Sequence, residues 1–94
     1  MAELIFEWDA NKAKRNIVKH GISFEEGSTV FGDTLSITIP DPLHSSPGEE
    51  RFVTIGQSVH GKILVVVHRD DNNTIRVISA RPATRKERKG YEES

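Results

Sequence analysis

Arginine and lysine gather in one short stretch of this chain. Between Arg76 and Lys89 there are six basic residues and a single acid, Glu87, although the whole chain has a formal net charge of -1. A local surplus of this size indicates a polyanion or an acidic partner. Arginine suits phosphate because its planar fork can bind two oxygens and stays charged at any relevant pH. The six residues are Arg76, Arg81, Arg85, Lys86, Arg88 and Lys89.

Three further residues are candidates for proton transfer. Histidine ordinarily titrates near physiological pH, which makes His20 the natural acid/base candidate, with His68 second. His20 also falls in the last turn of an expected helix, where packing and the helix dipole explain it equally well. Glu50 could act as a base if it were desolvated, although a glutamate at the exit of a proline-rich loop is more commonly solvated.

Composition removes several other chemistries. The chain has no cysteine, which excludes thiolate catalysis and a disulfide framework, and its four histidines are too scattered for a metal motif. We therefore expect no metal and no cofactor. No apolar run approaches the roughly 20 residues of a membrane span, and the N-terminal segment lacks a signal-peptide pattern, so we expect a cytoplasmic protein without a membrane partner.

The pattern along the chain predicts an α+β fold in one domain, residues 1–94. The first half should hold a short strand at 4–8, a helix capped by Asp9 and ended by Gly21, and a second short helix capped by Ser23. On the first helix Ala10, Ala13, Ile17 and Val18 should share the buried face, with Lys12, Arg15 and Lys19 opposite them.

The second half predicts strands at 35–39, 51–57, 63–67 and 75–80, of which the last three are joined by short turns as an antiparallel meander. The last strand runs straight into a helix at 85–93, whose start is marked by a capping box of Thr84 and Glu87. The expected order is β-α-α-β-β-β-β-α. Because Tyr91 is the only sizeable apolar residue of the last helix, we expect that helix to fray or to dock on a partner.

An ordered set of short motifs closely resembles the BrnT family of small bacterial toxins. The set comprises FEWDANKAKRNIVKHGISFEE, VFGD, ER at Glu50 and Arg51, IG, and ISARPATRKERKGY, and it covers the chain from Phe6 to Tyr91. The resemblance implies a RelE-like fold and a ribonuclease that acts as the toxin of a type II toxin–antitoxin pair, inhibiting translation and growth. It also implies a DNA-binding antitoxin similar to BrnA, which would neutralise the toxin by direct contact. DNA would then be reached only through the complex.

The resemblance also implies a set of site residues. Metal-free cleavage of RNA needs a base for the 2′-hydroxyl, cations for the phosphorane-like transition state, and an acid for the leaving 5′-oxygen. Arg51 and Arg81, at strand ends where side chains can converge, are expected to hold the phosphate, and His20 to transfer a proton with Glu50 as a lesser candidate. Trp8 is either a core anchor or a platform for a base. The expected substrate contacts are Trp8, Lys19, His68, Arg76, Arg85 and Arg88.

A non-catalytic alternative belongs to a different class. In that interpretation the basic C-terminal segment only binds an acidic antitoxin or a nucleic acid, and the protein serves as a co-repressor. The two hypotheses differ in one respect that a structure can address: the enzyme requires an acid/base group beside phosphate-binding cations.

Overall fold

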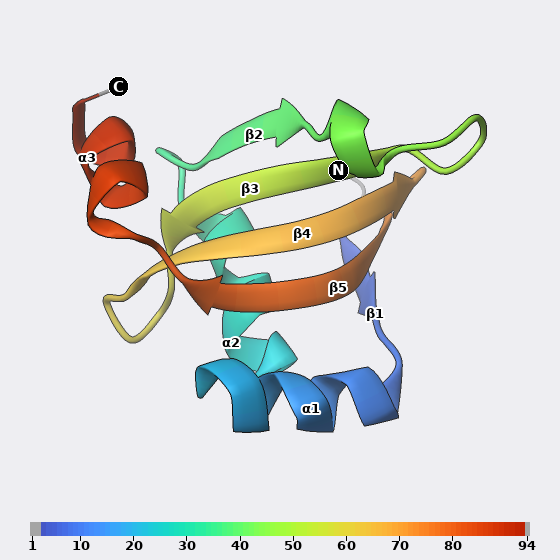
Figure 1. Cartoon of the computed structure of the whole chain (residues 1–94), viewed down its shortest axis with the longest axis horizontal. Helices are drawn as coiled ribbons and strands as arrows, with labels where there is room; N and C mark the ends of the chain where they lie inside the picture. The colour runs from blue at the N-terminus through green and yellow to red at the C-terminus, as the bar shows by residue number, and fades with distance from the viewer. Residues whose placement is uncertain (1–2, 94) are drawn as a thin grey trace.

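One five-stranded sheet forms the centre of the molecule in the computed structural model, which describes residues 3–93 (Figure 1). The strands are ordered β1-β5-β4-β3-β2 across the sheet. The order of elements along the chain is the one predicted, with two short 3-10 turns in addition. The elements are β1 Ile5–Glu7, α1 Ala10–His20, α2 Phe24–Ser28, η1 Thr29–Gly32, β2 Ile37–Pro40, η2 Pro42–His44, β3 Arg51–Gln57, β4 Ile63–Asp71, β5 Thr74–Pro82 and α3 Arg85–Glu93.

The predicted meander of β3, β4 and β5 is confirmed, because these strands pair antiparallel in sequence order. Strand β2 extends it by pairing antiparallel with β3. The turn between β4 and β5 consists of Asn72 and Asn73, and Asn72 adopts the positive φ that asparagine tolerates. Strand β1 adds a parallel edge to the meander, since Phe6 lies opposite Ile75 of β5. The sheet is therefore mixed, and its first strand lies beside its last.

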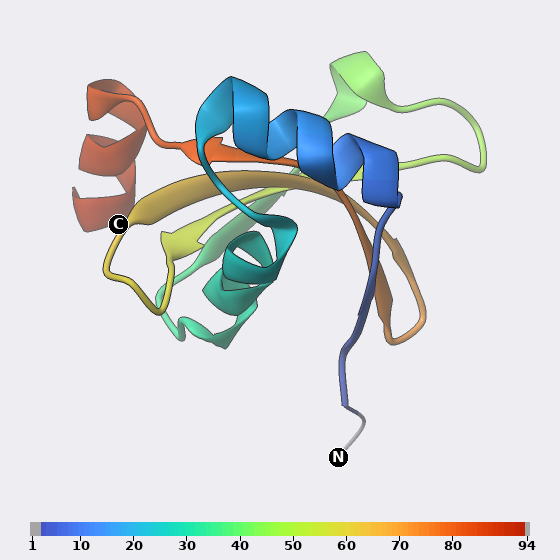
Figure 2. The same cartoon turned by 90° about the horizontal axis from the view of Figure 1, so that it is seen from below.

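The chain turns sharply after β1, and helix α1 then runs alongside β5 (Figures 1 and 2). Asp9 caps it by accepting from the backbone N–H of Lys12 at 2.9 Å, and Gly21 ends it at φ 72°, as predicted. Asn16 holds the helix in place: its side-chain amide bonds both the N–H and the carbonyl of Ala80. Asn16 thereby satisfies a part of the β5 edge that β1 does not reach.

The burial predicted for α1 needs correction. Val18 is 89% exposed and Ile17 49% exposed, whereas Asn16 is buried and Ala13 packs against the core. The helix packs by a narrow side on a strand edge and not by a broad apolar stripe on a sheet face, so only one small apolar residue faces the core. Sequence periodicity assigned Ile17 and Val18 to the wrong side.

The core lies between one face of the sheet and the segment α2–η1 (Figure 2). It is built from Ile22, Phe24 and Val30 against Leu64, Val66, Val77 and Ala80 of the sheet. The approach is close at Gly27, where a Cβ atom would lie 2.9 Å from the Cβ of Ala80. Any larger residue there would push α2 off the sheet. The opposite face of the sheet, which we call the open face, carries the side chains that alternate with these core residues.

Helix α3 docks on its own chain. The capping box is present in full: Glu87 N–H donates to the Thr84 hydroxyl at 3.2 Å, and Thr84 N–H donates to the Glu87 carboxylate at 2.9 Å. At the other end the Tyr91 hydroxyl donates to Asp33, and this bond raises the pKa of Tyr91 to about 12. The expectation that α3 frays or requires a partner is corrected by these contacts. No helix in residues 3–93 combines the length and the apolar character that crossing a membrane requires.

Candidate active site

The register of the strands determines which charged side chains meet on the open face. Arg51 of β3 lies opposite Arg69 of β4, which lies opposite Arg76 of β5, which lies opposite Glu7 of β1. We call Arg51, Arg69 and Arg76 the arginine row. Apolar side chains fill the centre of the face, and Arg81 lies at its far end, opposite Val65. The open face therefore has two separate basic regions.

Arg51 and Arg81 do not converge. Arg51 lies opposite Arg69, whereas Arg81 lies opposite Val65, four residues away along β4 and about 13 Å at the rise of a strand. Sequence placed both at strand ends, which is confirmed, but they mark opposite ends of the same face. One phosphate group cannot contact both guanidinium groups in this structure.

A cleft between α1 and β5 collects the basic residues of the helix. It has a volume of about 290 Å³, and its floor includes Asn16, Ile78 and Ser79. Ser79 lies opposite Val67 on the open face, so the cleft adjoins that face. We call it the α1 cleft; its lining residues are Lys12, Arg15, Asn16, Lys19, His20, Ile78 and Ser79.

His20 lies in this cleft, half-buried, at the last turn of α1. The predicted acid/base residue thus lines one cleft with Lys19 and Arg15, and no carboxylate lines the cleft among the residues described. A phosphate group bound by Lys19 at this end of the cleft would lie near the imidazole. Such a neighbour could donate a proton to an oxygen of that phosphate or accept one from a hydroxyl beside it.

Arg81 extends from β5 two residues beyond Ser79, but its guanidinium is engaged. Its two terminal nitrogens donate to the two carboxylate oxygens of Glu87 at 2.7 and 2.9 Å. The bond from Arg81 is the largest cause that lowers the pKa of Glu87 to about 2, and Glu87 in turn raises the pKa of Arg81. Arg81 can grip a phosphate with both nitrogens only after this pair opens.

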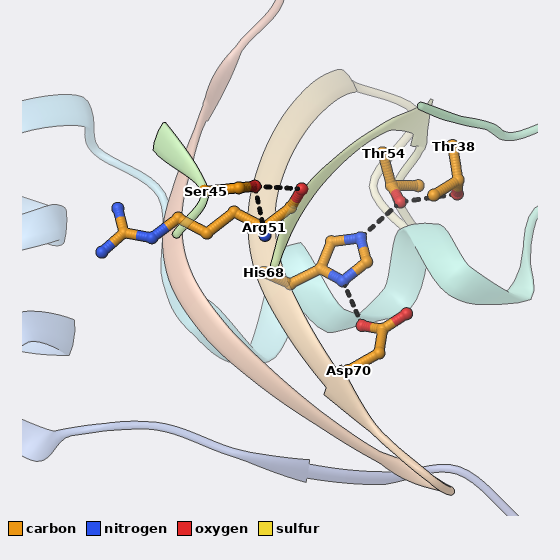
Figure 3. Close-up of polar contacts among 6 residues, drawn as sticks. All are labelled: Thr38, Ser45, Arg51, Thr54, His68 and Asp70. Carbon is orange, nitrogen blue, oxygen red and sulfur yellow. Dashed lines mark hydrogen bonds and ion pairs between the residues drawn. The ribbon is translucent and has the colours of Figure 1, made fainter. Parts of the chain in front are cut away.

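Arg51 is positioned through its backbone, and its guanidinium remains available. Its N–H donates to the Ser45 hydroxyl at 2.9 Å, which ties the start of β3 to the preceding loop. Within residues 3–93 no carboxylate lies within ion-pair distance of its side chain. Figure 3 shows this side chain pointing away from the ring of His68, to the other side of the sheet.

His68 is a core residue, which removes the basis for its predicted contact with substrate. It is 1% exposed, and its ring lies between Phe31 and Phe52, with centroids 4.9 and 6.0 Å away. Its Nδ1 pairs with Asp70 at 2.5 Å and its Nε2 with the Thr54 hydroxyl at 2.7 Å (Figure 3). Burial lowers the pKa of His68, against the opposing effect of Asp70. The ring is therefore a satisfied, neutral part of the core.

The other predicted residues are dispersed. Trp8 packs against the core, edge-on to Phe24 at 6.0 Å, which favours the anchor interpretation over a base-stacking platform. Glu50 is exposed and lines a different pocket, with Phe52 and Asp70, so it does not adjoin His20. Arg76 is exposed, 3.5 Å from Glu7. Arg85 and Arg88 are exposed on α3.

Several residues of this region escaped sequence reasoning. Asn16 was not singled out, although an asparagine three residues after Ala13 on a helix marks a polar contact on the same side. Arg69 was missed as well, and its alternation with Val65 and Val67 is the signal that places it on the open face. In residues 3–93 no three histidine, aspartate or glutamate side chains are arranged to hold a metal ion.

Comparison with known proteins identifies the family. The family model described as "Ribonuclease toxin, BrnT, of type II toxin-antitoxin system" matches residues 8–87. The chain belongs to the BrnT family. A solved structure of similar fold is the Brucella abortus ribonuclease toxin BrnT, with 24% sequence identity, a TM-score of 0.65, and coverage of 90% of this chain and 100% of that one. At this identity the likeness to that structure shows the fold alone. No curated protein matches the chain in sequence.

The family match gives the α1 cleft its context. BrnT toxins are ribonucleases of toxin–antitoxin systems, and the match spans both α1 and the strand β5 that form the cleft. It also spans the arginine row and the Arg81–Glu87 pair. The match therefore does not distinguish between these regions, and the geometry of their side chains does.

Proposed function

We propose that this protein is a metal-independent endoribonuclease whose reaction centre is the α1 cleft. The observation that carries the proposal is the presence of His20 in one cleft with several cations, Arg15 and Lys19 among them, and with no carboxylate among the residues described there. This is the combination that the enzyme hypothesis requires and that a purely binding module does not need. His44 and His60 are exposed, and His68 is buried in the core. None of these three lines any of the other pockets described in residues 3–93.

The chemistry is the internal transfer of an RNA phosphodiester. The 2′-oxygen attacks the adjacent phosphorus, the bond from phosphorus to the 5′-oxygen breaks, and the products are a 2′,3′-cyclic phosphate and a 5′-hydroxyl. One proton leaves the 2′-hydroxyl and one is added to the 5′-oxygen. His20 performs one of these two transfers, which contributes typically about 10²–10⁴-fold to a rate. Because lysine and arginine neutralise the developing negative charge, the reaction has no need of a metal ion for that purpose.

The arginines take different parts in this proposal. Arg81 lies on β5 close to the cleft, and it stabilises the transition state once the phosphate displaces Glu87 from its fork. Arg51 belongs to the arginine row and contacts RNA farther along the open face, together with Arg76. Glu50 is too remote from His20 to share a step with it, so its predicted role as a base receives no support from the geometry.

The partner follows from the type of toxin. A type II toxin is neutralised by an antitoxin that binds it directly, and we propose a BrnA-like DNA-binding protein in that role, with RNA as the substrate in the cytoplasm. The exposed basic residues of α3 give such a partner a surface that attracts acidic segments. Cleavage of messenger RNA would account for inhibited translation and growth.

The test uses purified protein and a short RNA in excess EDTA. We expect cleavage to persist, with fragments that end in 2′,3′-cyclic phosphate and begin with 5′-hydroxyl. An RNA with a 2′-O-methyl group at the scissile position should resist cleavage, because the nucleophile is blocked. Activity that EDTA abolishes and a divalent ion restores, or fragments with 5′-phosphate ends, would contradict the mechanism.

A further inference from the structure

The basic residues of the α1 cleft form a line. Lys12, Arg15 and Lys19 are spaced by three and four residues, so they project from one side of the helix. All three line the cleft, and His20, which follows Lys19 in the last turn of α1, lines it too. Since α1 rises about 1.5 Å per residue, Lys12 and Lys19 are about 10 Å apart along the helix axis.

Among the residues described, these cations form no close ion pair, although the charges of Lys12 and Arg15 help to lower the pKa of the nearby Asp9 carboxylate. None of the ion pairs formed within residues 3–93 involves Lys12, Arg15 or Lys19. Like charges three and four residues apart on a helix destabilise it by a few tenths of a kcal/mol per pair. On many helices such a line of cations is simply a solvated face. That explanation fits less well in this protein, because this side of α1 forms one wall of a cleft.

The two ends of the line differ. At the N-terminal end the carboxylate of Asp9 caps the helix. The hydrogen bond that it accepts from the backbone N–H of Lys12 is the largest cause of its lowered pKa. At the C-terminal end His20 adjoins the cleft, and Arg81 follows on β5. An anionic chain in the cleft would therefore extend from His20 toward Lys12 and meet a negative charge beyond it.

The facing wall favours a backbone over a base. It consists of Ile78 and Ser79 of β5, and the amide of Asn16 is already committed to Ala80 and Ile22. No aromatic side chain lines the cleft among the residues described, so there is no platform on which a base could stack. The lysine and arginine side chains of the cleft would therefore contact phosphate, and such contacts carry no sequence information.

We propose that the α1 cleft is a backbone-binding track for single-stranded RNA, in which Lys12 and Arg15 hold two phosphates on one side of the bond that reacts at His20. Its length of about 10 Å spans more than one phosphate of an RNA backbone. A single strand is favoured because the attacking 2′-oxygen must come into line with the leaving oxygen, which a regular duplex prevents. This inference rests on the proposed ribonuclease function and defines its substrate as single-stranded and its recognition as independent of sequence along the track.

The experiment measures binding separately from cleavage. Affinity for a fully 2′-O-methylated single-stranded octamer, which cannot react, is determined by fluorescence anisotropy over a range of salt concentrations. The test variant is Lys12→Gln/Arg15→Gln, and the matched control is Lys14→Gln/Lys62→Gln. The control removes the same charge, and both of its lysines are exposed and do not line the cleft. Circular dichroism establishes that both variants keep the fold.

We expect the test variant to flatten the slope of log affinity against log salt by about 1.4, since each phosphate contact to a single strand contributes about 0.7. The control should keep the slope of the wild type. In cleavage of long RNA the test variant should raise KM, and the control should keep the KM of the wild type. If the test variant had the same slope as the control, the proposed track would be wrong. Equal affinity of the wild type for the single strand and for a duplex of the same sequence would also overturn it.

The two proposals fail in different ways. If the protein binds the octamer through Lys12 and Arg15 but never cleaves RNA, the ribonuclease proposal fails and the backbone track remains as a binding site. If RNA is cleaved and the salt slope of the test variant is unchanged, the reaction stands and the track is wrong.

Discussion

Arg81 and Glu87 form a two-point ion pair, with nitrogen–oxygen distances of 2.7 and 2.9 Å, that joins the last strand to the last helix. The same carboxylate also accepts from the N–H of Thr84 and so caps α3. One side chain thus controls both the start of α3 and the availability of the arginine nearest the proposed reaction centre. A phosphate that occupies the fork of Arg81 competes with the helix for that arginine.

Replacing Glu87 with Gln should lower stability in a pH-dependent way. The pKa of Glu87 in the fold, about 2, lies below its ordinary value of 4.5, so its contribution is complete above pH 4.5 and is lost as the pH falls toward 2. We expect a loss of about 1 kcal/mol at pH 7, after a discount for the partial exposure of both partners. Urea denaturation at pH 7 and at pH 2.5 measures it, with the exposed Glu92→Gln as control. An equal loss at both pH values would show that the charge of Glu87 is not responsible.

The two predicted phosphate arginines should respond differently to lysine. In Arg81→Lys the fork is lost, and we expect RNA cleavage to fall by at least 10-fold through kcat, because a point charge cannot bind two oxygens at the reaction centre. Arg51→Lys should chiefly raise KM, since Arg51 lies at the other end of the open face. Steady-state kinetics on one RNA separates the two. A fall in kcat with Arg51→Lys as large as that with Arg81→Lys would place the reaction nearer the arginine row.

Asn16 should be among the most sensitive positions outside the core. Its amide bonds the carbonyls of Ile22 and Ala80 at 2.8 and 2.7 Å and accepts from the N–H of Ala80. Asn16→Ala leaves these buried backbone groups without partners, at about 1–3 kcal/mol each, and we expect a total loss of about 3 kcal/mol. Chemical denaturation tests this, with the exposed Asn11→Ala as control. If the two variants were equally stable, Asn16 would not be what holds α1 to β5.

His68 should make the protein sensitive to mild acid. Burial lowers its pKa below the ordinary 6.5, so the unfolded chain takes up a proton on this histidine at a higher pH than the folded chain. Stability therefore falls as the pH drops below 6.5 and is recovered as it rises. NMR titration of the folded protein should show His68 protonating below pH 6.5, and His68→Gln should remove part of the stability change between pH 7 and 5. A midpoint for His68 at or above pH 6.5 would show that the ring is not desolvated.

Local features of the chain were predictable, and non-local ones were not. The caps at Asp9 and Thr84 and the stop at Gly21 depend on residues within one turn, so sequence located them well. The separation of Arg51 from Arg81 depends on the register between strands, and the sequence of one strand alone does not determine that register. The pairing of Glu87 with Arg81 was hidden because the same glutamate fits a capping box.

The site was predictable to a similar extent. His20 and Lys19 were singled out, and both line the α1 cleft. Asn16, which holds α1 against β5, was not, because hydrophobic periodicity does not mark a buried polar residue. His68 was misplaced because a histidine at the end of an apolar strand has the same sequence pattern whether its ring faces solvent or core. The alternation of its strand puts it on the face of Leu64 and Val66.

The most direct test of the account is the rate of RNA cleavage by His20→Gln compared with His60→Gln, both measured in EDTA at equal concentrations of folded protein. His60 is exposed in the turn between β3 and β4 and does not line the α1 cleft. We predict that His20→Gln lowers kcat by at least 100-fold with little change in RNA affinity, and that His60→Gln cleaves like the wild type. Cleavage by His20→Gln at the rate of the wild type would contradict the claim that the α1 cleft is the reaction centre.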